Sequence, residues 1–141
     1  FTPEEQHTML TLWCLFGSPL MLGCELTKLD DATLALLTNR DVLSMLTPDC
    51  KPHQVCLDDE KAIWCAYNAV TGEHFAAFFN LSDETQTIHC DIETLHVGDE
   101  PCAHKDASLT ELWSKEKTSV SGSAISVTPP AHGCLVFRVE N

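Results

Sequence analysis

Four clusters of acidic residues are the first candidates for chemistry in this chain. They are Asp30-Asp31, Asp58-Asp59-Glu60, Asp83-Glu84 and Asp99-Glu100. Two carboxyl groups about 5–10 Å apart around a bound sugar would serve the acid/base hydrolysis of a glycosidic bond. Three of the clusters fall in turn-like contexts, and Asp30-Asp31 opens a helical pattern, where negative charge is expected for structural reasons. We therefore assign no catalytic residue among them.

Thiol and imidazole groups are the second candidates. The chain has seven histidines and eight cysteines, the latter at positions 14, 24, 50, 56, 65, 90, 102 and 134. Because no C-x-x-C, H-x-x-x-H or H-E-x-x-H spacing occurs, the sequence predicts no metal site and no Cys-His nucleophile. No glycine-rich phosphate or dinucleotide loop occurs either, and no cofactor is expected. The pattern favours reduced, buried thiols in a cytoplasmic protein, while the even count leaves a secreted, bridged protein open.

Aromatic rings and one sequon complete the candidate groups. Trp13, Trp64 and Trp113 belong to a residue type that stacks on sugar rings, but their apolar surroundings favour packing in the core. His7 lies on or beside the packed face of the first predicted helix, so we interpret it as structural. Residues 80–82, Asn-Leu-Ser, fit the acceptor sequence for N-glycosylation, which matters only in a secreted eukaryotic chain.

The charge and the apolar content of the chain exclude some classes of partner. The 141 residues include 21 acidic and 8 basic side chains, a net charge of −13. This balance argues against a nucleic acid or a membrane surface bound through a basic patch. An uncharged run separates Glu5 from Glu25, but residues 17–19, Gly-Ser-Pro, interrupt it, so no membrane-spanning helix is expected.

The first element that must position such groups is a helix at the N-terminus. Thr2 can cap it, Pro3 suits its first position, and Glu5 completes a capping box. The apolar residues that follow cover a wide face of the helix, as expected where a helix packs against a sheet. Gly17 supplies the stop.

Short buried strands are predicted to alternate with helices in residues 1–46. Residues 20–24 form a continuous apolar run typical of a strand buried on both faces. Asp30 can cap a second helix that ends near Asn39, and residues 42–46 are predicted as a second buried strand. This order is typical of a parallel α/β sheet, whose other strands we expect upstream of residue 1.

The pattern changes after a predicted linker at residues 47–52. Apolar residues then recur with a period close to two, and turn residues such as Thr71-Gly72 and Pro129-Pro130 separate the runs. The runs lie at residues 63–67, 75–79, 88–92, 125–127 and 135–139. Several short strands without a convincing helix predict an antiparallel β-sandwich.

Several stretches of the chain match a known family in sequence and in order. Near the N-terminus these are residues 2–7, Thr-Pro-Glu-Glu-Gln-His, with Leu12-Trp13-Cys14-Leu15, then residues 18–24, Ser-Pro-Leu-Met-Leu-Gly-Cys, and residues 29–39. Later ones are residues 78–84, 111–113 and 130–134. Together they resemble the late barrel region and the C-terminal sandwich of α-galactosidases of glycoside hydrolase family 27, the melibiases.

The resemblance implies a fold class and a division into two parts. Such enzymes have a (β/α)8 barrel followed by an antiparallel sandwich. The chain is accordingly expected to be mainly β, with residues 1–50 as the last elements of the barrel and residues 51–141 as the sandwich. The family hydrolyses terminal α-galactosides with retention, through two Asp residues on earlier barrel strands. Because neither Asp motif occurs here, the resemblance implies a C-terminal fragment that is not catalytic in isolation.

The resemblance also places two residues near a sugar. Active sites of such barrels lie at the C-terminal ends of the strands, so Cys24 and Glu25 would lie at the rim of the galactose pocket of the intact parent. The family more often has Asp where Glu25 stands. Residues 46–50, Leu-Thr-Pro-Asp-Cys, replace its usual Asn-Gln-Asp and Pro-Leu-Gly. An α-N-acetylgalactosaminide or a β-arabinopyranoside therefore stays open as substrate, beside galactose-containing saccharides.

A second hypothesis comes from another class of protein. The chain could be a stand-alone carbohydrate-binding or protein-interaction sandwich that carries two barrel elements. The two hypotheses differ in residues 1–46. If these residues belong to a barrel, their apolar faces lack partners in the isolated chain and are expected to self-associate.

Overall fold

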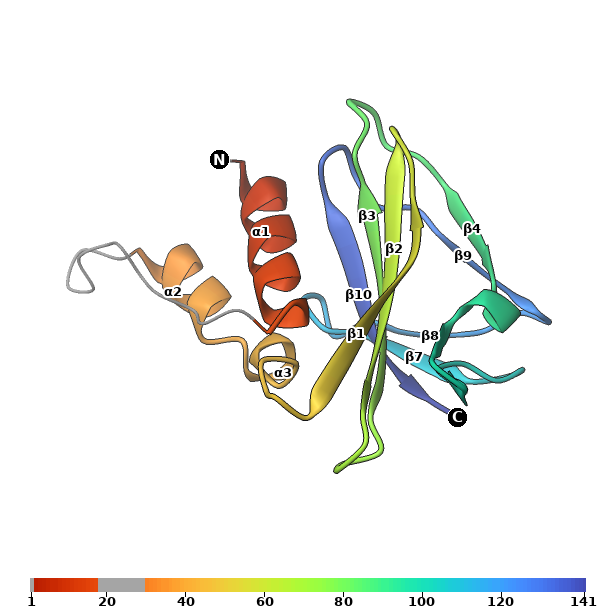
Figure 1. Cartoon of the computed structure of the whole chain (residues 1–141). Coiled ribbons are helices and arrows are strands. Elements are labelled where there is room, and N and C mark those ends of the chain that lie inside the picture. The colour runs from red at the N-terminus through yellow and green to blue at the C-terminus, as the bar shows by residue number, and fades with distance from the viewer. Residues whose placement is uncertain (1, 18–29) are drawn as a thin grey trace.

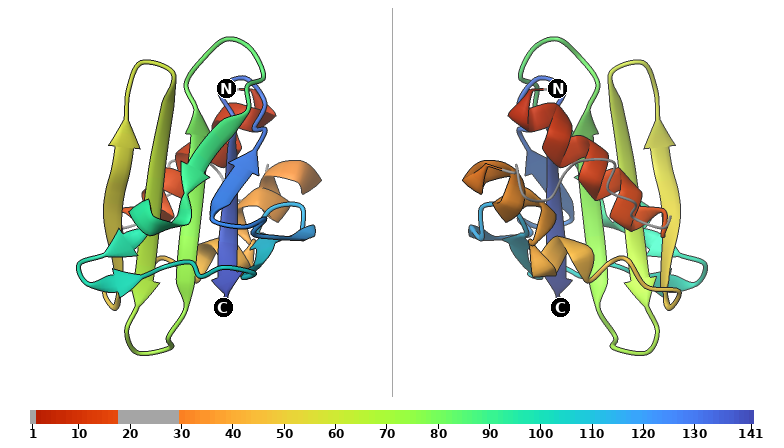
Figure 2. Two further views of the ribbon diagram at one scale, coloured as in Figure 1. Left: turned by 90° about the vertical axis from the view of Figure 1, so that its right-hand side faces the viewer. Right: turned by 90° about the vertical axis from the view of Figure 1, so that its left-hand side faces the viewer.

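The computed structural model describes residues 2–17 and 30–141, which form three layers (Figures 1 and 2). Helices lie on one face of a six-stranded antiparallel sheet, and a two-stranded ribbon covers the other face. This arrangement confirms the prediction of a mainly β chain with an antiparallel sandwich.

The first two helices begin at the predicted capping residues. Helix α1 (Pro3–Leu15) follows Thr2, whose hydroxyl accepts the N–H of Glu5 at 3.2 Å, while Glu5 Oε2 accepts the N–H of Thr2 at 2.9 Å. Helix α2 (Asp31–Leu37) follows Asp30, whose side chain accepts a backbone N–H three residues later at 2.7 Å. Both caps satisfy N–H groups that the first turn of a helix leaves without partners.

Residues 42–46 do not form the predicted buried strand, which is a correction. Helix α3 (Arg40–Leu43) occupies the start of this stretch, and Asn39 caps it by accepting two backbone N–H groups at 3.1 and 3.2 Å. A short apolar run fits a buried helical turn as well as a strand, and here the Asn cap selects the helix. The predicted strand at residues 20–24 lies outside the described residues.

The larger sheet has the strand order β1-β2-β3-β10-β7-β8, and every neighbouring pair is antiparallel. Its strands are β1 (Cys50–Leu57), β2 (Lys61–Asn68), β3 (His74–Asn80), β7 (Ser108–Glu111), β8 (Lys117–Ser119) and β10 (Cys134–Glu140). Strand β1 begins inside the stretch predicted as a linker. The predicted turn at Thr71-Gly72 does connect β2 with β3.

Two smaller pairs of strands lie over the other face of this sheet. Strand β4 (Ile88–Asp91) pairs with β9 (Ala124–Val127), and we call this pair the ribbon. Strand β5 (His96–Val97) pairs with β6 (Glu100–Pro101). The predicted strand at residues 88–92 ends one residue early, because the 3-10 turn η2 (Ile92–Thr94) begins there.

The six-stranded sheet separates two apolar cores. Phe78 on β3 is fully buried on the ribbon side, and its neighbour Phe79 is fully buried on the helix side. Helix α1 crosses the sheet diagonally (Figure 2) and contributes Leu10, Cys14 and Leu15 to the helix-side core. Strand β3 is therefore covered on both faces, which explains its nearly continuous apolar sequence.

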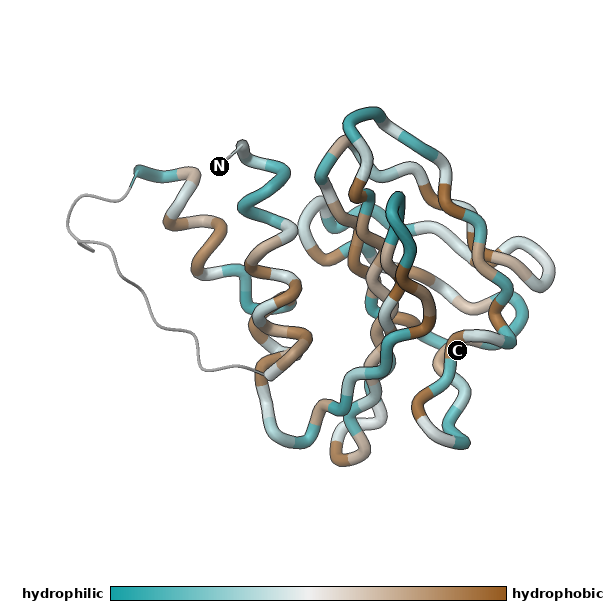
Figure 3. The backbone as a smooth tube through the Cα atoms, turned by 45° about the horizontal axis from the view of Figure 1, so that its top comes forward, coloured by the Kyte–Doolittle hydropathy of each residue, from teal (hydrophilic) through white to brown (hydrophobic). Residues whose placement is uncertain are grey.

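Helix α2 contacts the rest of the chain much less than α1 does. None of its residues is buried, although apolar positions run along it as they do along α1 (Figure 3). Leu34 on α2 keeps 49% of its surface exposed, and Phe16 after α1 keeps the same fraction. The helical layer thus leaves apolar side chains partly exposed, although the ring of Phe16 also packs edge-on against Trp64 of β2.

Candidate functional site

The two residues that the resemblance places at a pocket rim, Cys24 and Glu25, lie outside the described residues. Two described segments, one before and one after these residues in the chain, line a hollow of about 420 Å³. Phe16 and Gly17 line it from the end of α1, and residues 46–48 and 50–52 line it from the start of β1.

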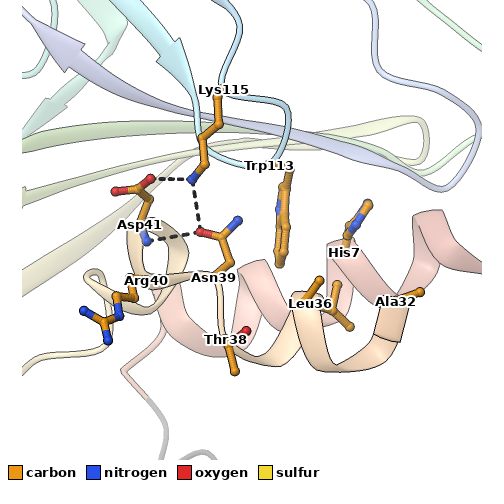
Figure 4. Close-up of a pocket in the computed structure, with 10 residues that line it drawn as sticks. His7, Ala32, Leu36, Thr38, Asn39, Arg40, Asp41, Trp113 and Lys115 are labelled. Carbon is orange, nitrogen blue, oxygen red and sulfur yellow. Dashed lines mark hydrogen bonds and ion pairs between the residues drawn. The ribbon is translucent and has the colours of Figure 1, made fainter. Parts of the chain in front are cut away.

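A second hollow lies between the helices and the loop that joins β7 to β8 (Figure 4). We call it the helix–sheet groove, and its volume of about 570 Å³ is within the range of small-molecule sites. Its lining residues are His7, Ala32, Ala35, Leu36, Thr38, Asn39, Arg40, Asp41, Trp113 and Lys115.

An aromatic pair forms one part of the groove. The rings of Trp113 and His7 stack with their centroids 4.5 Å apart. The indole N–H of Trp113 donates to Thr11 Oγ1 at 2.9 Å, and Thr11 is a fully buried residue of α1. Trp113 packs partly buried against the helix-side core, as Trp64 does. Both tryptophans therefore pack in the core as predicted, and Trp113 fastens α1 to the sheet.

A network of polar side chains forms the other end of the groove. Asn39 donates its amide N–H to the carbonyl oxygen of Leu112 at 3.0 Å, which ties the helices to the strand side. Lys115 forms an ion pair with Asp41, and Arg138 Nη2 lies 3.4 Å from the same carboxylate. The hydrogen bond from Lys115, helped by both positive charges, holds the pKa of Asp41 below its ordinary value.

This geometry favours a structural role for the groove over a catalytic one. Hydrolysis of a glycosidic bond needs two carboxyl groups, one of them with a raised pKa. Asp41 is the one carboxylate among the described lining residues, and it is committed to two cations. Its lowered pKa keeps it ionised, which suits an ion pair and not a general acid.

The predicted acidic clusters have local partners in the structure. Asp30 caps α2, and Asp58 accepts the backbone N–H groups of Glu60 and Lys61 at 2.8 and 2.9 Å. Asp83 Oδ1 lies 2.7 Å from His132 Nε2. None of these clusters contributes to the described lining of the helix–sheet groove.

Sequence reasoning did not single out Asn39, Asp41 and Lys115 as partners. Asn39 and Asp41 lie at the start of α3, and Lys115 in the β7–β8 loop follows them by more than seventy positions. The only signal was Asn39 itself, which was interpreted as a helix stop and in fact begins the next helix. Within residues 2–17 and 30–141, no three His, Cys, Asp or Glu side chains gather as metal ligands, and no helix is long and apolar enough to cross a membrane.

Comparisons with known proteins extend over the whole chain. The chain is 25% identical over 146 residues to α-galactosidase A of Cellvibrio japonicus, an alignment that covers 99% of this chain and 36% of that protein. A crystal structure of a GH27 β-L-arabinopyranosidase from Geobacillus stearothermophilus superposes with a TM-score of 0.87 at 30% identity. That superposition covers 100% of this chain and 31% of the other.

A more distant structure has the same fold. α-Galactosidase I from Mortierella vinacea superposes with a TM-score of 0.85 at 17% identity, over 99% of this chain and 36% of the other. The chain thus spans about a third of the length of the relatives that it matches.

One protein family accounts for the strands of the chain. Residues 58–139 match the family described as the α-galactosidase C-terminal β-sandwich domain. This match covers β2 to β10 nearly completely, and therefore more than half of the chain. The chain belongs to the α-galactosidase C-terminal β-sandwich family.

Proposed function

We propose that this chain is the C-terminal part of a retaining glycoside hydrolase that cleaves terminal α-galactosides, and that it does not catalyse the reaction alone. In this proposal, residues 1–50 are the last elements of a (β/α)8 barrel and residues 51–141 are the sandwich that packs beside it. Cys24 and Glu25 would lie at the rim of the sugar pocket of the whole enzyme.

The observation that carries the proposal is the alignment of the helices as well as the strands. An α-galactosidase aligns with 99% of the chain, which includes α1, α2 and α3, although the sandwich family alone begins at residue 58. A stand-alone sandwich would have no need of these helices. The exposed Leu34 on α2 and Met9 on α1 support a further layer that covers the helices in the whole enzyme.

The activity of the purified chain tests the second half of the proposal. We expect no turnover of an aryl α-galactoside, because the helix–sheet groove holds one ion-paired carboxylate and not an acid/base pair. The assay measures release of the aryl alcohol, with a family 27 α-galactosidase as the positive control. Turnover that persists through further purification would contradict the proposal.

The DNA upstream of the codon for Phe1 tests the first half. A reading frame that encodes barrel strands with two Asp motifs would support a parent hydrolase. A stop codon or an unrelated coding sequence at that place would refute it and favour the stand-alone sandwich. Calorimetry of the chain with galactose then separates the classes, since saturable binding is expected only of a binding module.

For the sugar that the whole enzyme accepts, we propose the configuration of the ring hydroxyls and not a single named sugar. One relative is named an α-galactosidase and one structural neighbour a β-L-arabinopyranosidase. These two sugars share the arrangement of ring hydroxyls and differ in the group at C5. We propose a terminal pyranoside of this configuration, and rates with aryl α-galactoside and aryl β-L-arabinopyranoside on the whole enzyme would rank the two.

A reducing compartment, the cytoplasm, is part of the proposal. The seven cysteines in the described residues are free thiols, and six of them are buried. Burial raises the pKa of Cys14 and Cys50 to about 11 and that of Cys134 to about 12. Such thiols stay protonated near neutral pH and pack as small apolar groups.

The isolated chain is expected to self-associate through its helical layer. Leu34 and Met9 are exposed on α2 and α1, and burying one leucine contributes about 1.5–3 kcal/mol. Leu34→Glu should therefore weaken self-association by about tenfold or more, measured by sedimentation velocity over a range of concentrations. Val70→Glu is the matched control, because Val70 is 74% exposed and belongs to the β2–β3 turn and not to the helical layer. Equal sedimentation of the two variants would contradict an interface on the helical layer.

A further inference from the structure

Two thiols meet in the core between the sheet and the ribbon. Cys65 lies on β2, and Cys102 follows directly after β6. Both side chains are 0% exposed and belong to the same apolar cluster. In the chain 36 residues separate them, and the sulfur of each contacts a backbone carbonyl near the other cysteine.

The backbone around each thiol fixes this contact. Cys65 Sγ donates to the carbonyl oxygen of His96 at 3.2 Å, and His96 pairs with Pro101, the residue before Cys102. Cys102 Sγ in turn lies 3.9 Å from the carbonyl oxygen of Ala66, the residue after Cys65. Each thiol thus reaches the chain beside the other, and a disulfide between them would bring the sulfurs to about 2.05 Å.

A small hairpin lies over the β1 side of the sheet (Figure 2), and the carbonyl oxygen of His96 in it accepts the hydrogen bond from Cys65. Strands β5 and β6 form it, and each has two residues. The ring of His96 stacks on His53 at 5.4 Å, and Glu100 Oε1 lies 3.0 Å from His74 Nε2. A unit with so few contacts opens at a lower free energy than the sheet beneath it, and its opening would admit a small oxidant.

We propose that Cys65 and Cys102 form a reversible disulfide when hydrogen peroxide reaches them. The Cys102 thiolate attacks one peroxide oxygen, the O–O bond breaks, and hydroxide leaves as Cys102 becomes a sulfenic acid. The Cys65 sulfur then attacks the Cys102 sulfur and displaces the hydroxyl group as water. In total the two thiols lose two protons and two electrons, and one peroxide takes them up and is reduced to two waters.

The two thiols differ in pKa, and the direction of the difference fits the order of these two reaction steps. The interaction with Cys65 lowers the pKa of Cys102, and the interaction with Cys102, together with burial, raises the pKa of Cys65. Cys102 is therefore the first thiolate and Cys65 the resolving thiol. Cys90 lies in the same cluster, but burial raises its pKa, and its sulfur contacts Thr94 and the carbonyl oxygen of Asp91.

Peptide mapping of the full chain tests the proposal. The chain is treated with hydrogen peroxide under native conditions, its free thiols are alkylated, and it is digested with trypsin and a glutamyl endopeptidase. Residues 62–73 and 94–105 then form separate peptides with one cysteine each. We expect these two peptides to be linked, to separate on treatment with dithiothreitol, and the linked chain to unfold at a midpoint roughly 5–15 °C higher.

Substitutions sharpen the test. Cys65→Ser and Cys102→Ser should each abolish the link, while Cys90→Ser, in the same core, should leave it unchanged. Glu100→Gln removes the carboxylate that holds the hairpin to His74, so it should speed the oxidation about two- to fivefold while keeping both thiols. Far-UV circular dichroism confirms that each variant folds.

Three results would overturn the proposal. In the first, both cysteines stay fully alkylated after peroxide treatment of the folded chain. In the second, the link forms only at denaturant concentrations that unfold the sheet. In the third, Cys90→Ser prevents the link as completely as Cys65→Ser does, or Glu100→Gln leaves its rate unchanged.

Discussion

Asn80→Asp is expected to lower the free energy of unfolding by about 3–5 kcal/mol. Asn80 ends β3 and is 1% exposed. Its amide nitrogen donates to the carbonyl oxygens of Glu84, Pro129 and Pro130 at 2.8, 3.2 and 3.0 Å. A carboxylate would face these three oxygens without a proton to donate, in a place that water does not reach.

The carbonyl oxygen of the same side chain accepts further bonds. Ser82 donates its backbone N–H and its hydroxyl to Asn80 Oδ1 at 2.9 and 2.7 Å, and Gln86 Nε2 donates at 2.7 Å. Asn80 therefore joins the loop after β3 to the loop before β10. Loss of the amide should loosen both loops together, which urea unfolding and amide exchange can measure.

Asn68→Asp is the matched control for this prediction. Asn68 is also buried, at 5% exposed, but its Oδ1 accepts the backbone N–H groups of Val70 and Thr71 at 2.9 and 3.1 Å. A carboxylate satisfies these donors as well as an amide does, so the expected cost is about 1 kcal/mol or less. If both variants lose the same stability, burial of charge and not the donor role of Asn80 would be the cause.

The position of Asn80 also answers a question that the sequence left open. Residues 80–82 fit a glycosylation sequon, but the amide nitrogen that would carry the glycan makes three hydrogen bonds inside the fold. In the folded chain, the side chain of Asn80 therefore has a structural role. A sequon match contains no information on burial, whereas the apolar run through residues 75–79 already indicated that the end of this strand is covered.

The elements that sequence predicted best are those with a strong local signal. The capping box at Thr2 and Glu5 fixed the start of α1, because its two hydrogen bonds lie within four residues. Alternating apolar residues located β2, β3 and β10, whose residues are divided between two cores. In these segments the local pattern and the tertiary packing require the same conformation.

The elements that sequence missed lack such a signal. Strand β1 contains Pro52, and its register shifts between Gln54 and Cys56, so its alternation changes phase midway. Strand β8 is exposed at all three positions and has no apolar pattern. Residues 42–46 were wrongly assigned to a strand because an apolar run of this length does not distinguish a strand from a helical turn.

The candidate site was predictable only in part for the same reason. The aromatic residues in it could be assigned to the core from their apolar neighbours. The contact between Asn39, Asp41 and Lys115 depends on how α3 lies against the β7–β8 loop, which no pattern within either segment encodes. Because Lys115 is so far from Asn39 and Asp41 in the sequence, only the tertiary fold brings these side chains together.

Trp113→Ala is the second prediction with a large effect, and it concerns the joint between the helices and the sheet. The substitution removes the stack on His7 and the hydrogen bond to Thr11 Oγ1, and it leaves space below α1. Because Trp113 is only partly buried, the expected loss is about 2–3 kcal/mol, below the range for a fully buried tryptophan.

The loss should be concentrated in α1. Its first half rests on Trp113 through His7, and its end rests on Trp64, whose ring lies 4.9 Å from that of Phe16. With the first anchor removed, the amides of α1 should exchange at least tenfold faster, while those of β3 and β10 keep most of their protection. Hydrogen exchange measured by mass spectrometry distinguishes this local opening from global unfolding.

Trp113→Phe separates packing from hydrogen bonding at this joint. Phenylalanine keeps an aromatic ring beside His7 but cannot donate to Thr11, so we expect a loss of about 1 kcal/mol and little change in the exchange of α1. Equal acceleration of exchange in α1, β3 and β10 by Trp113→Ala would mean that helices and sheet unfold as one unit. In that case the helical layer is an integral part of the sandwich. The absence of a neighbouring layer of the whole enzyme would then not explain why its apolar residues are exposed.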